Sequence, residues 1–360
     1  MSWVPEFSDG ASDYVIGDIL KVWSAGGAGA IGVSPIDGGT IEGPSALVKS
    51  GLFNSASRIT GFRIKFNSVN SSATFFSIRG TSDVHVFLRR KADASIELLG
   101  EGFAVLAADP TLVLATGTWY TFEFGVLISG TVGRIEVRVD GTQIPAMTSI
   151  ALGGSITNSL DTLNAAAVTN ATSISLDGGA TYDIDWIWTK YETAGAVWAA
   201  SDFLGNVTKI TRRAKASTAG NGHYITGTGW SVGAGGPLIP DAVRETTQDG
   251  DASYAIRAVA SGTDADRFSV IPEAMPSNTA TVKWLSHRAW VRNTTGSTST
   301  HKRFLYESTG ATTHDSAVTV TDGTSYAHGQ DNFTLHPNGA ALTKALVDSS
   351  ELGLKVVTLT

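Results

Sequence analysis

The sequence predicts an all-β protein of two β-sandwich domains, and three observations support this prediction. Apolar and polar residues alternate over many short segments, which is the pattern of strands that bury one face. Forty glycines stand beside ten prolines in 360 residues, a composition typical of short strands joined by tight turns. Helical periodicity is nearly absent, and the length is sufficient for two domains that each bury a core.

The first domain is expected to span residues 1–190. Its clearest part is residues 118–144, where apolar side chains alternate along two consecutive strands before Asp140 and Gly141, a strong hairpin signal. The aromatic segment at residues 182–188 is expected to be a core strand that closes this domain. The other expected strands comprise residues 59–66, 74–79, 84–89, 96–99, 111–114 and 174–176.

Residues 191–202 break the strand pattern and are the expected linker to a second, jelly-roll-like sandwich at residues 203–360. One short helix is expected near the C-terminus, at residues 340–346, before the polar residues 348–350. The expected strands of this domain comprise residues 203–211, 253–259, 267–271, 280–292, 302–307, 317–319, 327–335 and 354–359.

Composition excludes several classes of function. The formal net charge of -7 gives no support to nucleic-acid binding, which would need a basic face. The chain has no cysteine, which excludes disulfides, thiolate metal sites and cysteine nucleophiles. This suggests a protein that folds in a reducing cytosol, or one that never relied on disulfides outside it. The N-terminus lacks the pattern of a signal peptide, and no apolar run is long enough to span a bilayer. We therefore expect a soluble protein without membrane insertion.

Two short motifs match signatures of enzymes but lack the structural context that their chemistry needs. Residues 27–32 match GxGxxG, yet no helix can start at residues 33–39 to face a pyrophosphate, so a glycine-rich surface loop is expected. Residues 229–233 match the GxSxG elbow around Ser231, yet a glycine-rich stretch follows instead of a helix. A flexible loop around Trp230 is the expectation there.

Glycanases of the sandwich class place two or three carboxylates on one strand face, and this spacing is missing from the sequence. Glu97 and Glu101 form a close pair, but Gly100 between them indicates a strand end. Glu136 is expected on an exposed face between Arg134 and Arg138, where charge pairing is its expected role. The sequence thus predicts a protein that is not an enzyme.

Two sets of residues are candidates for binding. The histidines form no HxH or HxxxH pair, so the sequence gives no local support for a zinc or copper site. Asp249 and Asp251 lie in an expected loop, where calcium binding is an alternative to ordinary turn chemistry. No other cofactor is indicated. Sugar rings stack on exposed aromatic side chains, and the candidates for this role are Trp23, Trp119, Trp198 and Trp230. The alternative for each is burial in a core or an interface.

The first half resembles the laminin G and concanavalin A-like lectin sandwiches. The residues that carry this resemblance are Trp119, just before a strand, and the turn at Val139, Asp140 and Gly141 that ends the next strand. The resemblance implies a scaffold for recognition and assembly.

The second half is similar to a family of tailed-bacteriophage structural proteins. The similar segments are residues 202–207 (DFLGNV), 240–245 (PDAVRE), 249–254 (DGDASY), 342–346 (LTKAL) and 351–357 (ELGLKVV), with Asn206 where the family has an acid. The similarity implies a non-enzymatic structural component of a virion, assembled in the host cytoplasm and associated with the tail or a tail fibre. It also leaves a capsid decoration or head-fibre protein open as an alternative, and a carbohydrate-binding module or adhesin is the other class.

The partners that follow from this resemblance are other virion proteins and a glycan on the host surface. A homo-oligomer is also expected, with a trimer favoured, because sandwiches expose edge strands and identical chains usually assemble with closed symmetry.

Overall fold

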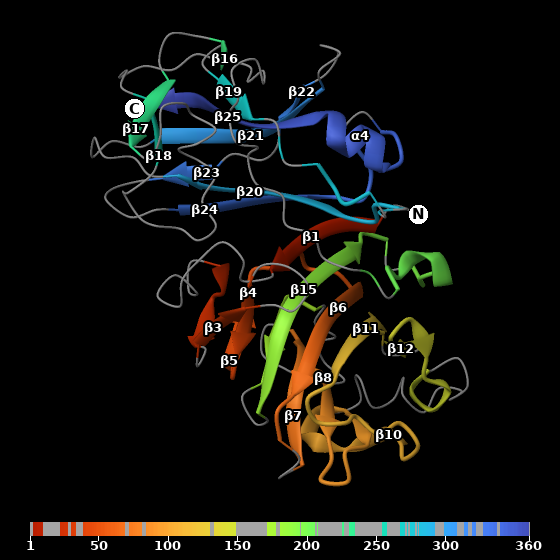
Figure 1. Ribbon diagram of the computed structural model, residues 1–360. Helices are drawn as coiled ribbons and strands as arrows, with labels where there is room; N and C mark the ends of the chain where they lie inside the picture. Colours follow the sequence, from red (N-terminus) through yellow and green to blue (C-terminus); the bar gives the residue numbers. More distant parts are fainter. Residues whose placement is uncertain are drawn as a thin grey trace. The chain divides into compact units, whose positions relative to one another are not determined.

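The computed structural model describes residues 3–9, 22–27, 30–33, 39–68, 72–80, 84–129, 133–148, 171–177, 181–194, 196–205, 207, 225–226, 230–234, 254–257, 267–270, 272, 274–277, 279, 281–291, 299–307, 313–315, 319–321, 327–336 and 339–359. The chain divides into two compact units, Met1–Lys209 and Ile210–Thr360 (Figure 1). Both consist of antiparallel sheets, and a short helix precedes the last strand, so the predicted all-β fold class is confirmed. In the described part of the chain, no helix is long and apolar enough to cross a lipid bilayer.

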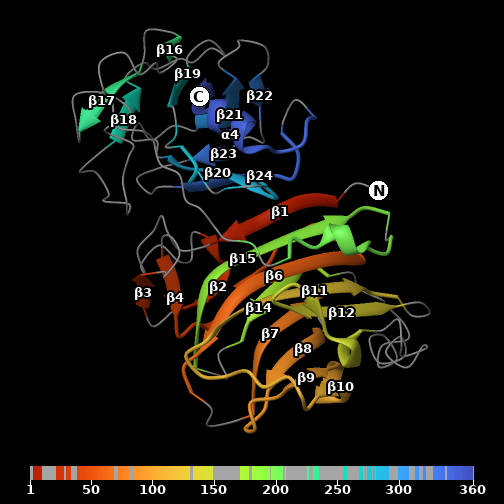
Figure 2. The same ribbon diagram turned by 45° about the vertical axis from the view of Figure 1, so that its right-hand side comes forward.

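The first unit is a sandwich of two antiparallel sheets (Figure 2). The larger sheet has the spatial order β13 (Thr142–Gln143), β12 (Arg134–Val139), β11 (Trp119–Leu127), β6 (Ser57–Phe66), β15 (Tyr182–Glu192), β4 (Gly39–Glu42) and β3 (Ala30–Val33), and β1 (Trp3–Asp9) also pairs with β15. The smaller sheet has the order β10 (Val105–Asp109), β9 (Ile96–Leu99), β8 (Val84–Arg90), β7 (Ala73–Arg79), β14 (Ser173–Leu176), β5 (Ser45–Lys49) and β2 (Ala25–Gly27). Short 3-10 turns are η2 (Glu101–Phe103), η3 (Pro145–Met147) and η5 (Ala200–Asp202).

Phenylalanine rings from both sheets form the centre of this sandwich. Phe62 of β6 lies opposite Phe122 of β11, and their rings stack with centroids 5.5 Å apart. From the smaller sheet, Phe75 and Phe76 both contact the Phe62 ring, at 6.2 and 4.7 Å. Consecutive residues can face the same side here because the register of β7 shifts between Thr74 and Phe76, as a β-bulge allows. All four rings are at most 1% exposed, so the alternation in the sequence does mark the core.

The hairpin that Asp140 and Gly141 predict is present between β12 and β13. Both residues have positive φ, 50° and 79°, which is the conformation of a type I′ turn. One loop prediction and one strand prediction for this unit are wrong. Gly27 ends β2 and residues 30–33 form β3, because β5 and β4 supply their hydrogen-bonding partners. The strand expected at residues 111–114 is absent there, and β10 at Val105–Asp109 occupies the edge beside β9 instead.

Residues 196–205, which we call the strap, lie on the outward face of the larger sheet. Trp198 and Phe203 are 8% and 3% exposed, and a Cβ on Gly125 of β11 would come within 3.0 Å of both rings. The strap contains most of residues 191–202, which were expected as a linker. It packs against the larger sheet, where the rings of Trp198 and Phe203 are buried. The expectation that Glu136 faces solvent is wrong for the same reason, since this side chain is 3% exposed and accepts a hydrogen bond from Trp198 Nε1 at 2.7 Å.

The second unit contains one larger sheet and two strand pairs in its described part. The larger sheet has the order β16 (Ile225–Thr226), β19 (Arg267–Val270), β25 (Ser350–Leu359), β21 (Ser299–Glu307) and β22 (Thr313–Asp315), and β23 (Thr319–Thr321) also pairs with β21. The strand pairs are β17 (Trp230–Ala234) with β18 (Tyr254–Arg257), and β20 (Leu285–Val291) with β24 (Ala327–Phe333). Ser231 therefore lies inside a paired strand, opposite Ile256, and the loop expected around Trp230 is wrong.

The short helix α4 spans Lys344–Ser349, later than the expected residues 340–346. Its start is set by Thr343, whose hydroxyl accepts a hydrogen bond from Leu346 N at 3.2 Å and caps the first turn. The preceding residues cannot join the helix because Ala341 forms a β-bridge with Leu335 and Ala340 O accepts a bond from His336 N. Val347 of the helix packs with Met275 and Leu342 in a small apolar cluster.

Candidate functional site

An aromatic ring and several polar side chains meet on the outward face of the larger sheet in the first unit. Trp119, the first residue of β11, lies directly opposite Lys65 of β6. Arg63 is two residues away on β6, so its side chain leaves the same face of the sheet. The guanidinium carbon of Arg63 lies 5.0 Å from the centroid of the Trp119 ring, and Lys65 Nζ lies 5.2 Å from it. Trp119 is partly exposed, so this is a cation–π cluster at the surface.

Two carboxylates of β15 hold these cations in place. Lys65 Nζ lies 2.8 Å from Asp183 Oδ2, and Arg63 Nη1 lies 2.7 Å from Asp185 Oδ2. Asn67 Nδ2 also donates to Asp183 Oδ1, at 2.8 Å. The set of six residues, which we call the Trp119 patch, comprises Arg63, Lys65, Asn67, Trp119, Asp183 and Asp185.

The two carboxylates leave the same face of β15 because they are two residues apart in the strand. The register between β15 and β6 shifts between Ile184 and Trp186, which makes Asp185 the extra residue. The aspartate side chains are 9% and 0% exposed, whereas those of Lys65 and Arg63 are 28% and 16% exposed, and Asn67 is exposed as well. The patch therefore presents a ring and N–H donors to solvent, with the carboxylates behind them.

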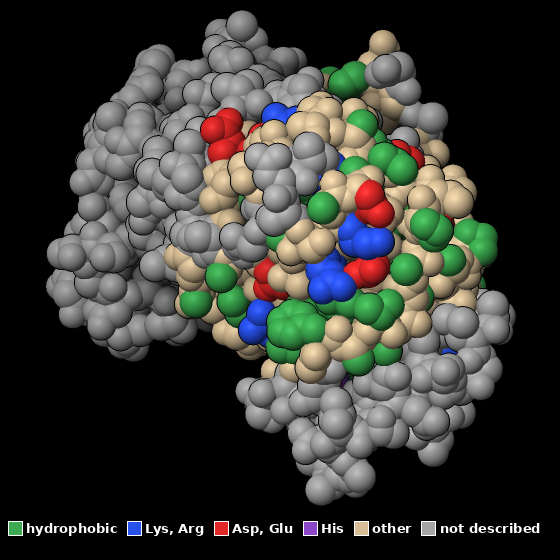
Figure 3. Space-filling model, turned by 90° about the horizontal axis from the view of Figure 1, so that it is seen from below, with side chains coloured by type: hydrophobic (Ala, Val, Ile, Leu, Met, Phe, Trp, Pro, Cys, Tyr) green, Lys and Arg blue, Asp and Glu red, His purple; other side chains and the backbone are tan. Residues whose placement is uncertain are grey.

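One described face of the molecule is mixed in character. Figure 3 shows one face of the molecule, on which hydrophobic side chains are scattered among basic and acidic ones. The largest exposed apolar side chains in the described part of the chain include Phe103, at 56%, whose ring stacks on Phe87 with centroids 4.8 Å apart. Phe103 belongs to the end of the smaller sheet and has no polar cluster comparable to the Trp119 patch among the contacts described.

The structure separates the four tryptophans that the sequence singles out. Trp23 is 1% exposed, with its Nε1 donating to Asp9 Oδ2 at 2.6 Å, and Trp198 of the strap is 8% exposed, with its ring against the larger sheet. Rings buried to this degree have no open face for a sugar. Trp230 lies in β17, but its side chain is outside the described residues. Trp119 is thus the one of the three described rings that reaches the surface.

The candidate calcium ligands Asp249 and Asp251 lie outside the described residues, and calcium binding there stays a prediction. Among the residues that the structure describes, no group of three or more histidine, aspartate or glutamate side chains is placed to hold a metal ion. Asp183 and Asp185, which are also close in sequence, form ion pairs with cations of β6 instead.

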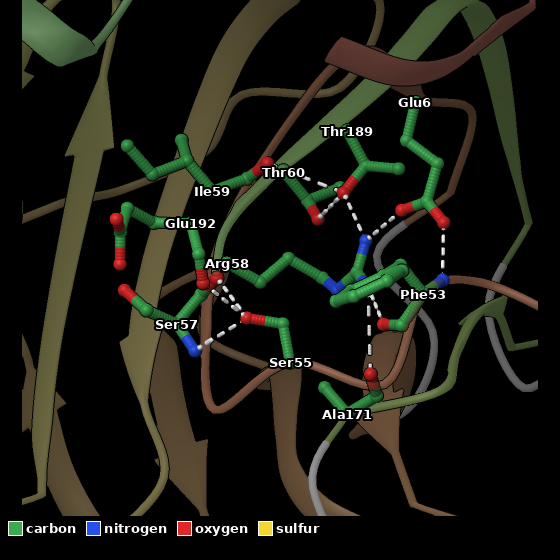
Figure 4. A network of polar contacts seen from close by, with 10 residues as sticks. All are labelled: Glu6, Phe53, Ser55, Ser57, Arg58, Ile59, Thr60, Ala171, Thr189 and Glu192. Atoms are coloured by element: carbon green, nitrogen blue, oxygen red, sulfur yellow. Dashed lines mark hydrogen bonds and ion pairs between the residues drawn. The ribbon is translucent and has the colours of Figure 1, made fainter. Parts of the chain in front are cut away.

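A second polar cluster surrounds Arg58 and is buried (Figure 4). Arg58 is 0% exposed, and its Nη1 lies 2.6 Å from Glu6 Oε2 of β1 and 3.2 Å from Thr189 Oγ1 of β15. Its Nη2 donates to the carbonyl oxygens of Phe53 at 2.8 Å and Ala171 at 3.4 Å. Because the guanidinium ties four separate segments together away from solvent, we assign this cluster a structural role.

Sequence reasoning found Trp119 but missed the side chains that surround it. Arg63 and Lys65 stand at alternate positions of one predicted strand, and Asp183 and Asp185 at alternate positions of another. These two spacings indicate charged outward faces, which is a signal that the sequence does contain. Pairing of the two strands with each other, and the bulge at Asp185, cannot be read from the sequence.

Comparison with known proteins does not place the chain in a family. No protein-family model matches it. No curated protein matches it either. Among solved structures, the cellulose-induced protein Cip1 is 15% identical, with 53% of this chain and 94% of that chain covered and a TM-score of 0.36. Domain 4 of AbnA, an extracellular arabinanase from Geobacillus stearothermophilus in complex with arabinotriose, is 17% identical, with 45% and 74% covered and a TM-score of 0.32. The galectin LEC-6 of Caenorhabditis elegans is 13% identical, with 42% and 94% covered and a TM-score of 0.28. All three identities are below 20%, and all three TM-scores are below 0.4.

Proposed function

We propose that the first domain is a non-enzymatic carbohydrate-binding module and that the Trp119 patch is its glycan site. The observation that carries this proposal is a tryptophan ring at the surface, flanked by side chains that buried carboxylates hold in fixed positions. Lys65, Arg63 and Asn67 each donate to Asp183 or Asp185 at 2.7 to 2.8 Å, so these donors are ordered before any ligand arrives.

A sugar ring fits this arrangement chemically. One face of a pyranose or furanose carries C–H groups that pack on an aromatic ring, and its edge carries hydroxyls that need hydrogen-bond partners. Trp119 supplies the apolar platform, while the ammonium of Lys65 and the amide of Asn67 can donate to hydroxyl or ring oxygens. The ion pairs with Asp183 and Asp185 balance the charges of Lys65 and Arg63, so the patch needs no charged ligand.

Replacement of the ring tests the proposal. We expect Trp119→Ala to weaken glycan binding about tenfold or more, because a stacking contact worth roughly 1.4 kcal/mol or more is lost. A glycan array would identify a bound sugar for the full chain, and calorimetry would compare the affinities of the parent and the variant for it.

Phe103→Ala is the matched control, since it also removes an exposed aromatic ring, but from the turn η2 that follows β9 of the smaller sheet. It should leave binding unchanged. The proposal is overturned by the absence of binding to any glycan on the array, or by equal affinity of Trp119→Ala and the parent for the sugar that binds.

A second proposal concerns the biological setting, namely a structural component of a phage virion that contacts host glycans. It is supported by the sequence similarity of the second half, where the ELGLKVV segment lies in β25, a strand paired on both sides with β19 and β21. We expect the chain to be detected by mass spectrometry in purified virions and to form a homo-oligomer, with a trimer favoured, in light scattering at micromolar concentration. A strict monomer that is also missing from virions would contradict this setting without affecting the glycan site.

A further inference from the structure

An exposed pair of stacked aromatic rings lies near the C-terminal end of β15. Phe53, in the loop between β5 and β6, is 48% exposed. Its ring stacks on that of Tyr191 in β15, with centroids 4.3 Å apart and planes inclined by 13°. Tyr191 is itself partly exposed. We call these two rings the aromatic platform.

The backbone of Phe53 is held on both sides by the buried cluster around Arg58 (Figure 4). Phe53 N donates to the carboxylate of Glu6, and Phe53 O accepts from Arg58 Nη2 at 2.8 Å. Glu6 and Arg58 also pair with each other, at 2.6 Å. One residue earlier, Leu52 N donates to Thr172 O at 3.0 Å. These contacts and the stacking fix the Phe53 ring before any ligand arrives, which lowers the entropic cost of binding.

Polar groups lie beside Phe53 in the chain. Ser50 and Asn54 of the same loop are exposed, and Tyr191 brings a hydroxyl to the platform. The surroundings of Phe103 differ, because the exposed residue that follows it closely is the apolar Val105. A sugar ring needs both an apolar surface for its C–H groups and hydrogen-bond partners for its hydroxyls, and the loop of Phe53 supplies both.

The platform is separate from the Trp119 patch. In the pairing of β6 with its two neighbours, Tyr191 lies opposite Arg58, and Trp119 lies opposite Lys65. Arg58 and Lys65 are seven residues apart in β6, which corresponds to about 23 Å along a strand. A single sugar unit therefore cannot contact both places.

We propose that the aromatic platform is a second glycan-binding site of the first domain, weaker than the Trp119 patch and independent of it. This proposal rests on the proposed function of the domain as a carbohydrate-binding module. Two separate sites would let one molecule hold two glycan chains at once.

The difference in strength follows from the charged groups at the two sites. Arg58 is 0% exposed and uses its N–H groups on protein oxygens, so it cannot donate to a ligand at the platform. Lys65 and Arg63 of the Trp119 patch reach the surface, where they can donate to sugar oxygens. Hydrogen bonds from charged donors are stronger than those from neutral ones, so the platform should bind the same sugar more weakly.

Calorimetry on full-length variants, with the sugar that the glycan array identifies, tests the second site. Trp119→Ala should keep a residual binding, weaker than that of the parent. Adding Phe53→Leu should weaken this residual binding a further tenfold or more, because leucine offers no ring for stacking. Phe53→Tyr in the same background retains the ring and should keep the residual binding.

Phe103→Leu in the Trp119→Ala background is the matched control and should leave the residual affinity unchanged. The midpoint of thermal unfolding checks that each variant is folded. Equal residual affinity with and without Phe53→Leu overturns the second site. Complete loss of binding in Trp119→Ala alone also overturns it, while leaving the Trp119 patch in place. Undiminished binding in Trp119→Ala that Phe53→Leu then removes would support the platform and contradict the Trp119 site.

Discussion

Glu6→Gln is expected to lower the free energy of unfolding of the first domain by about 3–5 kcal/mol. The substitution keeps the size of the side chain but removes the negative charge beside the buried guanidinium of Arg58. Thr189 and the two carbonyl oxygens that also contact Arg58 carry no formal charge, so the cation would remain buried without a counter-charge. The same carboxylate accepts a hydrogen bond from Phe53 N, and this contact is weakened as well.

Urea unfolding of the full chain, followed by tryptophan fluorescence, measures this loss. Lys91→Gln is the control because Lys91 is partly exposed at 34%, and its ion pairs are with the exposed Asp93 at 3.3 Å and, at 3.8 Å, with Glu97, which keeps Arg89 as a partner. Exposed pairs contribute at most about 1 kcal/mol, so the control should unfold near the parent. Equal stability of Glu6→Gln and Lys91→Gln would show that Arg58 does not need the charge of Glu6.

Gly61→Ala is expected to destabilise the first domain by about 3 kcal/mol, at the upper end of the usual effect of overpacking. Gly61 lies opposite Trp188 in the pairing of β6 with β15. A Cβ at Gly61 would be 2.3 Å from the indole Nε1 of Trp188, a residue that is 1% exposed. We expect the methyl group to displace the buried ring or to separate β6 from β15.

Gly100→Ala provides the comparison for this prediction. Its φ is -90°, which suits any residue, and a Cβ there would be 3.2 Å from the nearest atom of the flexible Leu106 side chain. We expect the midpoint of thermal unfolding to change little for Gly100→Ala and to fall clearly for Gly61→Ala. A Gly61→Ala protein as stable as the parent would mean that Trp188 can reorient without cost.

Local patterns in the sequence were enough for the fold class and for many elements of the first domain. Alternation at a period of two identifies the buried faces of β11 and β12, because a strand sends successive side chains to opposite sides. Asp140 and Gly141 determine the turn after β12, since a type I′ turn needs positive φ at two positions and these residue types accept it. Both signals depend only on residues that are adjacent in the chain.

The tertiary structure decided which outward faces are really exposed. Glu136 belongs to the polar side of its strand, yet the strap covers it, because Trp198 and Phe203 return some sixty residues later to bury their rings against Gly125. The tertiary structure also decided which aromatic ring of the candidate site is exposed. The sequence offers four tryptophans, and pairing of β11, β6 and β15 determines that Trp119 lies at the surface beside Lys65 and Asp183. Strand order and strap packing depend on contacts between segments that are distant in sequence, and the periodicity of a single strand contains no information about them.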